Sequence, residues 1–328
     1  MAFLKVKNLK KYFPVTHGVF QRRKGWVYAV DDISFCLDRG KTLGIVGESG
    51  CGKTTLGRCI MGLYPLTSGE VLLEGKAVSG PGSVNIRQLS RKMQMIFQDP
   101  FESLDPRQTV GEILKEKYII HGRKHKDLDK TVSDLACRAG LDRQSLLKFP
   151  HEFSGGQRQR IGIARAISMD PEIIICDEPV SALDVSVQSK ILNLLLELQQ
   201  QMGLTYIFIS HDLSVVRHVA DKIAVMYLGK IVEMADTDDI YNHARHPYTR
   251  ALLSAIPVPD PEACRDRIIL KGELPSVENP PAGCRFNTRC DKAQDICRAR
   301  EPVLLACRDN PGHMTACHFP VDQGNKQS

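Results

Sequence analysis

Residues 47–55, GESGCGKTT, constrain the fold of this chain more than any other stretch. They follow a short continuous apolar run at residues 43–46 and precede four apolar residues at helical spacing, Leu56, Cys59, Ile60 and Leu63. A glycine loop that joins a buried strand to a helix is the context in which backbone amides bind a phosphate chain. The sequence therefore predicts a nucleotide-binding α/β sheet, rather than a plain glycine turn before a helix.

The glycines of this loop let the backbone turn its amides toward one point, which creates an anion nest at a helix N-terminus. Lys53 is expected to reach the β- and γ-phosphates, and the Thr54 hydroxyl is expected to ligate Mg²⁺. The residues that we expect to contact ATP here are Gly47, Glu48, Ser49, Gly50, Cys51, Gly52, Lys53, Thr54 and Thr55.

Asp177 and Glu178 close a second continuous apolar run, at residues 173–176. A parallel strand delivers such carboxylates to the edge of the sheet where ligands bind. Asp177 is predicted to hold Mg²⁺ together with Thr54, and Glu178 is predicted to polarise the attacking water. An Asp-Glu pair can also be a helix cap or a solvated pair, but the metal site begun by Thr54 favours the catalytic interpretation.

A further anion site is predicted at the start of FSGGQRQRIGIARAIS, residues 153–168. Ser154 suits a helix N-cap, and Gly155 and Gly156 expose amides at the positive end of the helix. A phosphate loop and a second anion site in one chain are most simply explained by two subunits arranged head to tail. Each subunit would then cap the ATP of the other, whereas the alternative is an ordinary capped helix.

The remaining pattern places strands and helices around these motifs. Residues 105–165 have helical character, and an amphipathic helix through Ile191 and Leu198 should stop at Gly203. Strands are expected at residues 3–9, 29–37, 70–75, 93–97, 204–209 and 224–227, the first two of them antiparallel. Strands that alternate with helices indicate an α/β sheet with crossover connections.

Composition excludes several classes of protein. The net charge of +6 suits an anionic ligand or a lipid-facing surface, but without a clustered basic face it does not indicate nucleic-acid binding. The first residues lack the apolar core of a signal peptide, and no run approaches the ~18 apolar residues that a membrane span needs. We therefore expect a soluble chain whose membrane role comes through partners.

From about residue 256 the chain becomes rich in proline and then in cysteine. Six of the eleven cysteines lie between Cys264 and Cys317, and four of them have the spacing C-x5-C-x6-C-x19-C: Cys284, Cys290, Cys297 and Cys317. Four thiolates suit an iron–sulfur cluster or a closed zinc site, and free thiols are the third alternative. A tail with so few apolar residues cannot build a hydrophobic core of its own, so it needs a cross-link such as a bound metal to hold it together.

These motifs together resemble those of ABC transporter ATPase subunits over roughly residues 1–320. GESGCGKTT is similar to the Walker A loop, IIICDE to the Walker B strand, and SGGQ to the ABC signature. The resemblance implies that Gln98 in MIFQDP contacts Mg²⁺ and the attacking water, and that His211 in ISHD contacts the γ-phosphate. It also implies that Ser154–Gln157 and Asp184, at the end of SALD, touch the partner's ATP. Tyr12 or Phe13 would stack on adenine.

Finer features resemble the dipeptide/oligopeptide/nickel importer ATPases: QDPFESLDPR, HPYTRALLSAIP and GELPSVENPPAGCRFNTRC. The insertion between Tyr12 and Ala29 is more similar to the second of that system's two paralogous ATPases. The resemblance implies a P-loop NTPase core with an antiparallel β subdomain and a helical subdomain at about 105–165, all within an ATPase domain of residues 1–250. Residues 251–328 would be a C-terminal domain with a proline-rich linker and four cysteines that bind a [4Fe-4S] cluster.

The same family pattern implies the partners. A paralogous ATPase or a second copy of this chain would pair with it beneath two integral-membrane permeases, on the cytoplasmic face of the membrane. An external solute-binding protein would deliver the cargo, which is a dipeptide, a longer peptide or a nickel chelate. The rival interpretations are a soluble ABC ATPase acting on DNA or ribosomes, and a regulator or iron–sulfur protein whose ATPase is incidental. The first rival class typically carries long coiled-coil insertions or two cassettes, which this sequence lacks.

Overall fold

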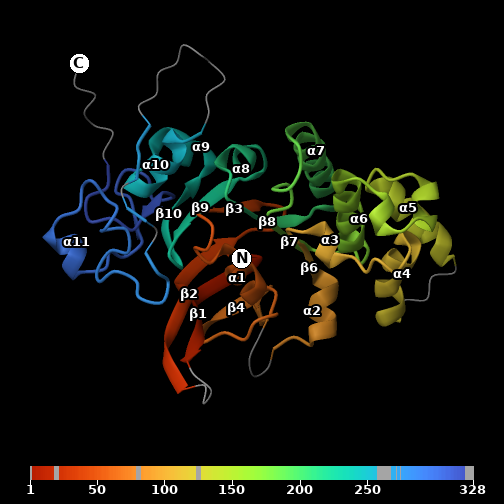
Figure 1. Ribbon diagram of the computed structural model, residues 1–328, viewed down its shortest axis with the longest axis horizontal. Helices are drawn as coiled ribbons and strands as arrows, with labels where there is room; N and C mark the ends of the chain where they lie inside the picture. The colour runs from red at the N-terminus through yellow and green to blue at the C-terminus, as the bar shows by residue number, and fades with distance from the viewer. Residues whose placement is uncertain are drawn as a thin grey trace, which may run out of the picture.

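Apolar runs of β-branched residues form the centre of a mixed eight-stranded sheet in the computed structural model (Figure 1). The model describes residues 2–17, 22–78, 83–122, 127–256, 267–270, 272–273 and 275–321. Five neighbouring parallel strands run in the order β9 (Lys222–Tyr227), β3 (Thr42–Val46), β8 (Thr205–Ser210), β7 (Ile173–Asp177) and β6 (Met93–Ile96). Every residue of β3, β7 and β8 is buried, because packed elements cover both faces of the sheet.

A separate four-stranded antiparallel sheet covers the N-terminal part of the core. Its order is β2 (Arg22–Leu37), β1 (Leu4–His17), β4 (Ser68–Leu73) and β5 (Lys76–Ala77). Leu4, Val6 and Leu9 alternate with more exposed residues and join one apolar cluster with α1 (Lys53–Ile60). The two strands expected at residues 3–9 and 29–37 are therefore present and are longer than the alternation indicated.

The region of residues 105–165 is helical, as expected, and lies at one side of the sheet in Figure 1. Capping boxes begin two of its helices, with Thr109 before α4 and Ser154 before α6. The helices that accompany the sheet are α2 (Ile86–Lys92), α3 (Pro100–Ser103), α4 (Val110–Ile120), α5 (Leu128–Arg138), η1 (Arg143–Leu147), η2 (Pro150–Glu152), α6 (Gly155–Ile167), α7 (Val185–Met202) and α8 (Leu213–Val219).

Two glycines in the left-handed conformation follow the ends of α7 and α1, and the sequence predicted the end of α7 only. α7 stops at Gly203, as predicted, because this residue adopts the left-handed conformation with φ of 64°. The apolar spacing also placed Leu63 on α1, which was wrong. The helix ends at Ile60, Gly62 has φ of 72°, and Leu63 is half exposed beyond this turn.

The C-terminal part of the chain joins the main sheet instead of standing apart. β10 (Lys230–Asp236) pairs antiparallel with β9 and also with β12 (Met314–Thr315), which in turn pairs with β11 (Leu305–Ala306). Three short helices complete this part: α9 (Thr237–His243), α10 (Pro247–Ser254) and α11 (Asp295–Ala299). The sequence analysis predicted neither β10 nor this docking, and β11 and β12, with two residues each, are too short to show an alternation.

An aromatic cluster anchors the tail to the core. Phe286 is only 2% exposed, and its ring centroid lies 5.3 Å from that of Tyr227 and 5.4 Å from that of Tyr248. In the described part of the chain, the tail packs on the core of the main sheet and not on a core of its own, as its composition indicated.

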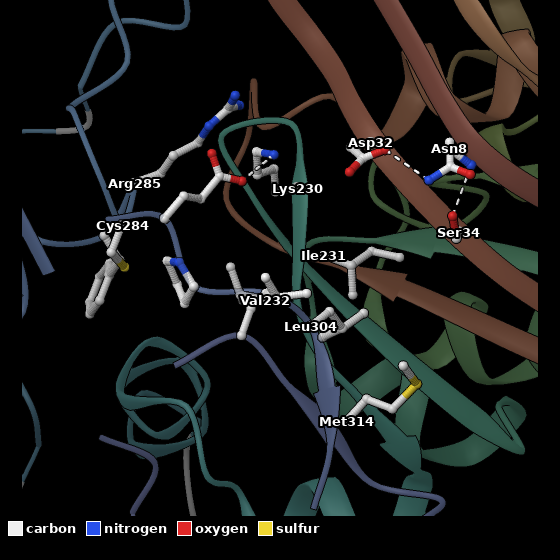
Figure 2. A pocket seen from close by; sticks show the side chains of 15 residues that line it. Asn8, Asp32, Ser34, Lys230, Ile231, Val232, Cys284, Arg285, Leu304 and Met314 are labelled. Atoms are coloured by element: carbon white, nitrogen blue, oxygen red, sulfur yellow. Dashed lines mark hydrogen bonds and ion pairs between the residues drawn. The ribbon is translucent and has the colours of Figure 1, made fainter. Parts of the chain in front are cut away.

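Ion pairs add to this attachment beside a cavity of about 360 Å³ (Figure 2). Arg285 binds the Asp31 carboxylate, and Lys230 lies 3.2 Å from Asp31 and also pairs with Glu301. Asn8, which hydrogen-bonds to Asp32 and Ser34, lies on the other side of the view from Arg285 and Lys230 in Figure 2. The tail is thus joined by charge to the antiparallel sheet as well as to β10.

Removing the Phe286 ring should therefore release the tail. We expect Phe286→Ala to lower the free energy of unfolding by about 3–5 kcal/mol, because it leaves a large cavity between two buried tyrosines. Hydrogen exchange should show the loss concentrated in residues 275–321. Phe101→Ala, at a ring that is 56% exposed, is the matched control and should change stability little. Equal losses of stability in the two variants would contradict the role of Phe286 in attaching the tail to the main sheet.

Parts of the N-terminal insertion and of the proline-rich linker lie outside the described residues. This applies to residues 18–21 in the insertion after Tyr12, and to residues 257–266 of the proline-rich linker with Cys264. Within the described ranges, none of the helices combines the length and apolar character that a bilayer crossing requires.

Candidate functional site

The loop after β3 is closed by glycines that no other residue can replace without strain. Gly52 has φ of 105°, and a Cβ added to it would lie 2.0 Å from the carbonyl oxygen of Ala29. Gly47 has φ of 154°, and its Cβ would lie 2.2 Å from the carbonyl oxygen of Met226. Positive φ and close backbone approach together require glycine at both positions. The loop is therefore held in one shape by the strands around it.

Lys53 occupies the inside of this loop. Its side-chain Nζ donates to the carbonyl oxygens of Gly47, at 2.8 Å, and of Glu48, at 3.0 Å, and the residue is 5% exposed. Ser49 and Gly50 form the exposed tip, whereas Cys51 is buried below it. This ammonium at the start of α1, surrounded by loop amides, suits a bound phosphate chain.

Two side chains with oxygen atoms that can ligate a metal ion meet where β7 ends beside α1. The Thr54 hydroxyl donates to Asp177 Oδ1 at 2.9 Å, and Asp177 is 2% exposed. Burial raises the pKa of the Asp177 carboxyl, and the hydrogen bond from Thr54 opposes this rise. A buried carboxylate beside a hydroxyl is a set of oxygen ligands that fits Mg²⁺. The structure thus brings together two of the three residues that we expected to contact this ion, and Gln98, the third, binds Glu178.

Glu178 lies at the meeting point of three loops that follow parallel strands. Gln98 Nε2 donates to Glu178 Oε2 at 3.2 Å, and His211 Nδ1 lies 3.1 Å from the same oxygen. These three residues come after β6, β7 and β8, which are adjacent in the sheet, so their side chains converge at one edge. The backbone of Glu178 has φ of 47° and its N–H binds the Ile209 carbonyl, which fixes the carboxylate in this position. The constellation can hold and polarise a water.

A groove of about 1080 Å³ leads from this carboxylate toward the helical region. Its lining includes Glu178 and His211 as well as Lys117 and Ile120 on α4. Lys117 Nζ donates to the Arg165 carbonyl on α6 at 2.7 Å and to the Gln94 side chain on β6. Burial lowers the pKa of Lys117 to about 7. The strand that leads to Gln98 is therefore tied directly to both helices of the groove.

The signature segment forms a separate, exposed surface. Ser154 Oγ accepts from the Gln157 N–H at 3.4 Å, and Gln157 Oε1 accepts from the Ser154 N–H at 3.1 Å. Gly156 packs so closely on α7 that a Cβ would lie 2.4 Å from Val187 Cγ1. Ser154, Gly155 and Asp184 are exposed, so the N-terminus of α6 and the turn before α7 share one accessible face. This face and the phosphate loop belong to different parts of the fold, as Figure 1 shows for α6 and α1.

Tyr12 and Phe13 have different partners. Tyr12 packs against Tyr28, with ring centroids 4.8 Å apart, and its hydroxyl donates to Asp31. Phe13 packs edge-on against Tyr64 at 5.6 Å. Both rings remain predictions for the adenine site.

The four tail cysteines line one small cavity of about 20 Å³ beside α10, together with Phe286 and Phe319. Burial raises the pKa of the Cys284 and Cys317 thiols to about 11. Across the described part of the chain, no group of three or more His, Cys, Asp or Glu side chains is arranged to hold a metal ion. The spacing therefore gathers the thiols around one point, but they do not form a preformed single-ion site.

Two residues that touch the phosphate loop were not identified from the sequence. The Tyr248 hydroxyl accepts from the Glu48 N–H at 2.9 Å, and Arg289 Nη1 binds Glu48 Oε2 at 2.7 Å. Tyr248 belongs to the stretch HPYTRALLSAIP and Arg289 to CRFNTRC. Neither stretch predicts this contact, because an interaction over some two hundred residues leaves no local signal.

Comparisons with known proteins agree with this geometry. The family model described as ABC transporter matches residues 30–181, and the one described as oligopeptide/dipeptide transporter, C-terminal region, matches residues 232–297. The oligopeptide transport ATP-binding protein AppF of Bacillus subtilis (strain 168) is 51% identical over 322 residues, which are 97% of each chain.

Solved structures show the same ATPase fold. The dimeric post-hydrolysis structure of the ATP-binding cassette MJ0796 bound to ADP and Pi is 27% identical, with a TM-score of 0.62, over 71% of this chain and 98% of that one. The cbiO1 protein of Clostridium perfringens, part of the ABC transporter complex cbiONQ, is 26% identical, with a TM-score of 0.62, over 74% and 91% of the two chains. The protein described here therefore belongs to the ATP-binding proteins of the ABC peptide importer family.

Proposed function

We propose that this chain hydrolyses ATP as one of two ATPase subunits that drive peptide uptake through a membrane transporter. The observation that carries the proposal is the meeting of Gln98, Glu178 and His211 beside the Thr54–Asp177 pair. The signature face is exposed and separate from this site, which supports a head-to-tail pair of subunits. MJ0796, which is similar in fold, is described as dimeric.

Each residue then has a defined task. The loop amides and Lys53 bind the β- and γ-phosphates, and Thr54 and Asp177 hold Mg²⁺, which offsets phosphate charge when bound. Glu178 accepts a proton from the attacking water, which Gln98 orients, while His211 contacts the γ-phosphate. Ser154–Gln157 and Asp184 of the partner subunit complete the pocket from the other side. Binding of two ATP molecules closes the pair, and hydrolysis with phosphate release opens it.

The groove beside α4 and α6 is the proposed contact for a permease. Lys117 connects it to β6 and so to Gln98, which supports a mechanical link between the groove and the catalytic site. Two permeases would hold the ATPase pair at the cytoplasmic face of the membrane, with an external solute-binding protein that supplies cargo. The second subunit is a paralogous ATPase or a copy of this chain. A peptide is the proposed cargo, because AppF is named for oligopeptide transport; nickel chelates are the alternative.

Purification of the assembled transporter tests this function. We expect the chain to co-purify with two integral-membrane permeases, and its ATPase rate to rise when peptide-loaded binding protein is added to the reconstituted complex. An ATPase rate that rises with a nickel chelate but not with peptides would overturn the assignment of peptides as the cargo. A chain that stays without permeases when these are co-expressed would overturn the transport role.

We also propose that Cys284, Cys290, Cys297 and Cys317 bind a [4Fe-4S] cluster that staples the tail. The support is the small cavity that the four cysteines line together. Thiols with raised pKa values release protons when they bind a metal, so binding should weaken as pH falls.

Metal analysis tests the cluster. Anaerobically purified protein should contain iron and acid-labile sulfide in equal amounts and absorb visible light, and Cys290→Ser should remove most of both. Cys36→Ser, at an exposed cysteine far along the chain from the tail, is the matched control and should retain them. Zinc, or no metal, in the anaerobic sample would contradict the proposal.

A further inference from the structure

The phosphate-binding loop is supported from outside by the C-terminal part of the chain. Two side chains converge on Glu48, the second residue of GESGCGKTT. The Tyr248 hydroxyl accepts the Glu48 backbone N–H at 2.9 Å, and the Arg289 guanidinium binds the Glu48 carboxylate at 2.7 Å. Main-chain and side-chain groups of one loop residue are thus both held by residues from α10 and the tail.

The supporting residues are themselves fixed by packing. Tyr248 is fully buried against Tyr227 and Phe286, with ring centroids 4.7 and 5.4 Å away. The Arg289 side chain is 9% exposed and that of Glu48 is 27% exposed, so the ion pair is largely shielded from water. Although burial alone would lower it, the pKa of Arg289 is raised by its hydrogen bond to Glu48. A shielded, charge-assisted hydrogen bond is stronger than an exposed one.

The geometry points to a function for these contacts. We propose that Arg289 and Tyr248 are positioning residues for ATP binding, which hold the phosphate loop in its binding conformation through Glu48. A loop that is already ordered loses less conformational entropy on binding, so the support should strengthen nucleotide binding rather than speed the chemical step. The inference rests on the proposed ATPase function, and it assigns part of the ATP affinity to a tail that lies outside the loop.

A mutant cycle on the full-length chain tests the proposal. The variants are Arg289→Gln, Arg289→Lys, Glu48→Gln and the double variant Arg289→Gln/Glu48→Gln, with ATP affinity measured by nucleotide titration. We expect Arg289→Gln and Glu48→Gln each to raise the Kd for ATP about three- to tenfold, the size of one charge-assisted hydrogen bond. The double variant should be no weaker than either single one, because both remove the same contact. Arg289→Lys should restore part of the affinity.

Tyr248→Phe tests the second contact without disturbing the core. It keeps the buried ring and removes only the hydroxyl that accepts the Glu48 N–H, so a rise in Kd cannot be attributed to unfolding of the tail. Arg298→Gln is the matched control for charge: the Arg298 side chain is 63% exposed and pairs with Asp295 on the same short helix, α11. This variant should bind ATP as the wild type does.

The outcomes distinguish the support of the phosphate loop from the ATPase function on which it rests. In the assembled transporter, the supported-loop proposal requires KM for ATP to rise in Arg289→Gln while kcat stays within about twofold. Unchanged Kd in both Arg289→Gln and Tyr248→Phe, or additive losses in the double variant, would overturn it. A wild-type chain that does not bind ATP would instead overturn the proposed function itself.

Discussion

Glu178→Gln is expected to lower the ATPase rate by about 10²- to 10³-fold while ATP binding stays close to that of the wild type. The substitution keeps the shape of the side chain and leaves an oxygen that can accept from Gln98, but it removes the charge that draws a proton from water. Phosphoryl transfer depends on positioning and electrostatics, so a neutral amide should arrest the step without emptying the pocket. Phosphate release and nucleotide titration measure the two quantities separately.

The arrested enzyme should also remain closed. Because hydrolysis opens the pair of subunits in the proposed cycle, the Glu178→Gln variant should elute with ATP as a dimer, and with ADP as the open or monomeric form. Glu197→Gln, at an exposed carboxylate on α7, makes the same chemical change and should hydrolyse ATP normally. Near-normal hydrolysis by Glu178→Gln would refute its assignment as the base.

Ser154→Asp is expected to lower hydrolysis by about 10²-fold, whereas Ser154→Asn should keep most of it. Aspartate and asparagine are both good N-caps, so each can replace Ser154 at the start of α6. Only aspartate places a negative charge where the partner's γ-phosphate would dock. The comparison therefore separates the electrostatic role of this helix end from its stability.

The step that Ser154→Asp impairs is as informative as the size of the effect. ATP affinity of the isolated chain should be unchanged in both variants, because the phosphate loop is untouched. The loss should appear in ATP-driven dimer formation and in turnover. Equal activity of Ser154→Asp and Ser154→Asn would remove the trans contact from the mechanism, and so would full turnover by a monomer.

The sequence by itself indicated the parallel core and the residues that carry chemistry, and the reason is local. A continuous apolar run such as residues 173–176 predicts a strand buried on both faces, and parallel strands end at a common edge. The side chains that follow them, at Lys53, Asp177 and His211, must then lie near one another. Order along the chain was sufficient for this, because strand, loop and helix follow within a few residues.

Only the tertiary structure decided how the C-terminal part is used. The pairing of β12 with β10, the packing of Phe286 on Tyr227 and Tyr248, and the contact of Arg289 with Glu48 join residues that are about forty to more than two hundred positions apart. Such contacts depend on the twist of the sheet and the fit of side chains across it, which no local pattern records. The sequence therefore predicted that the tail has no core of its own, and the fold showed that the tail packs on the main sheet and contacts the phosphate loop.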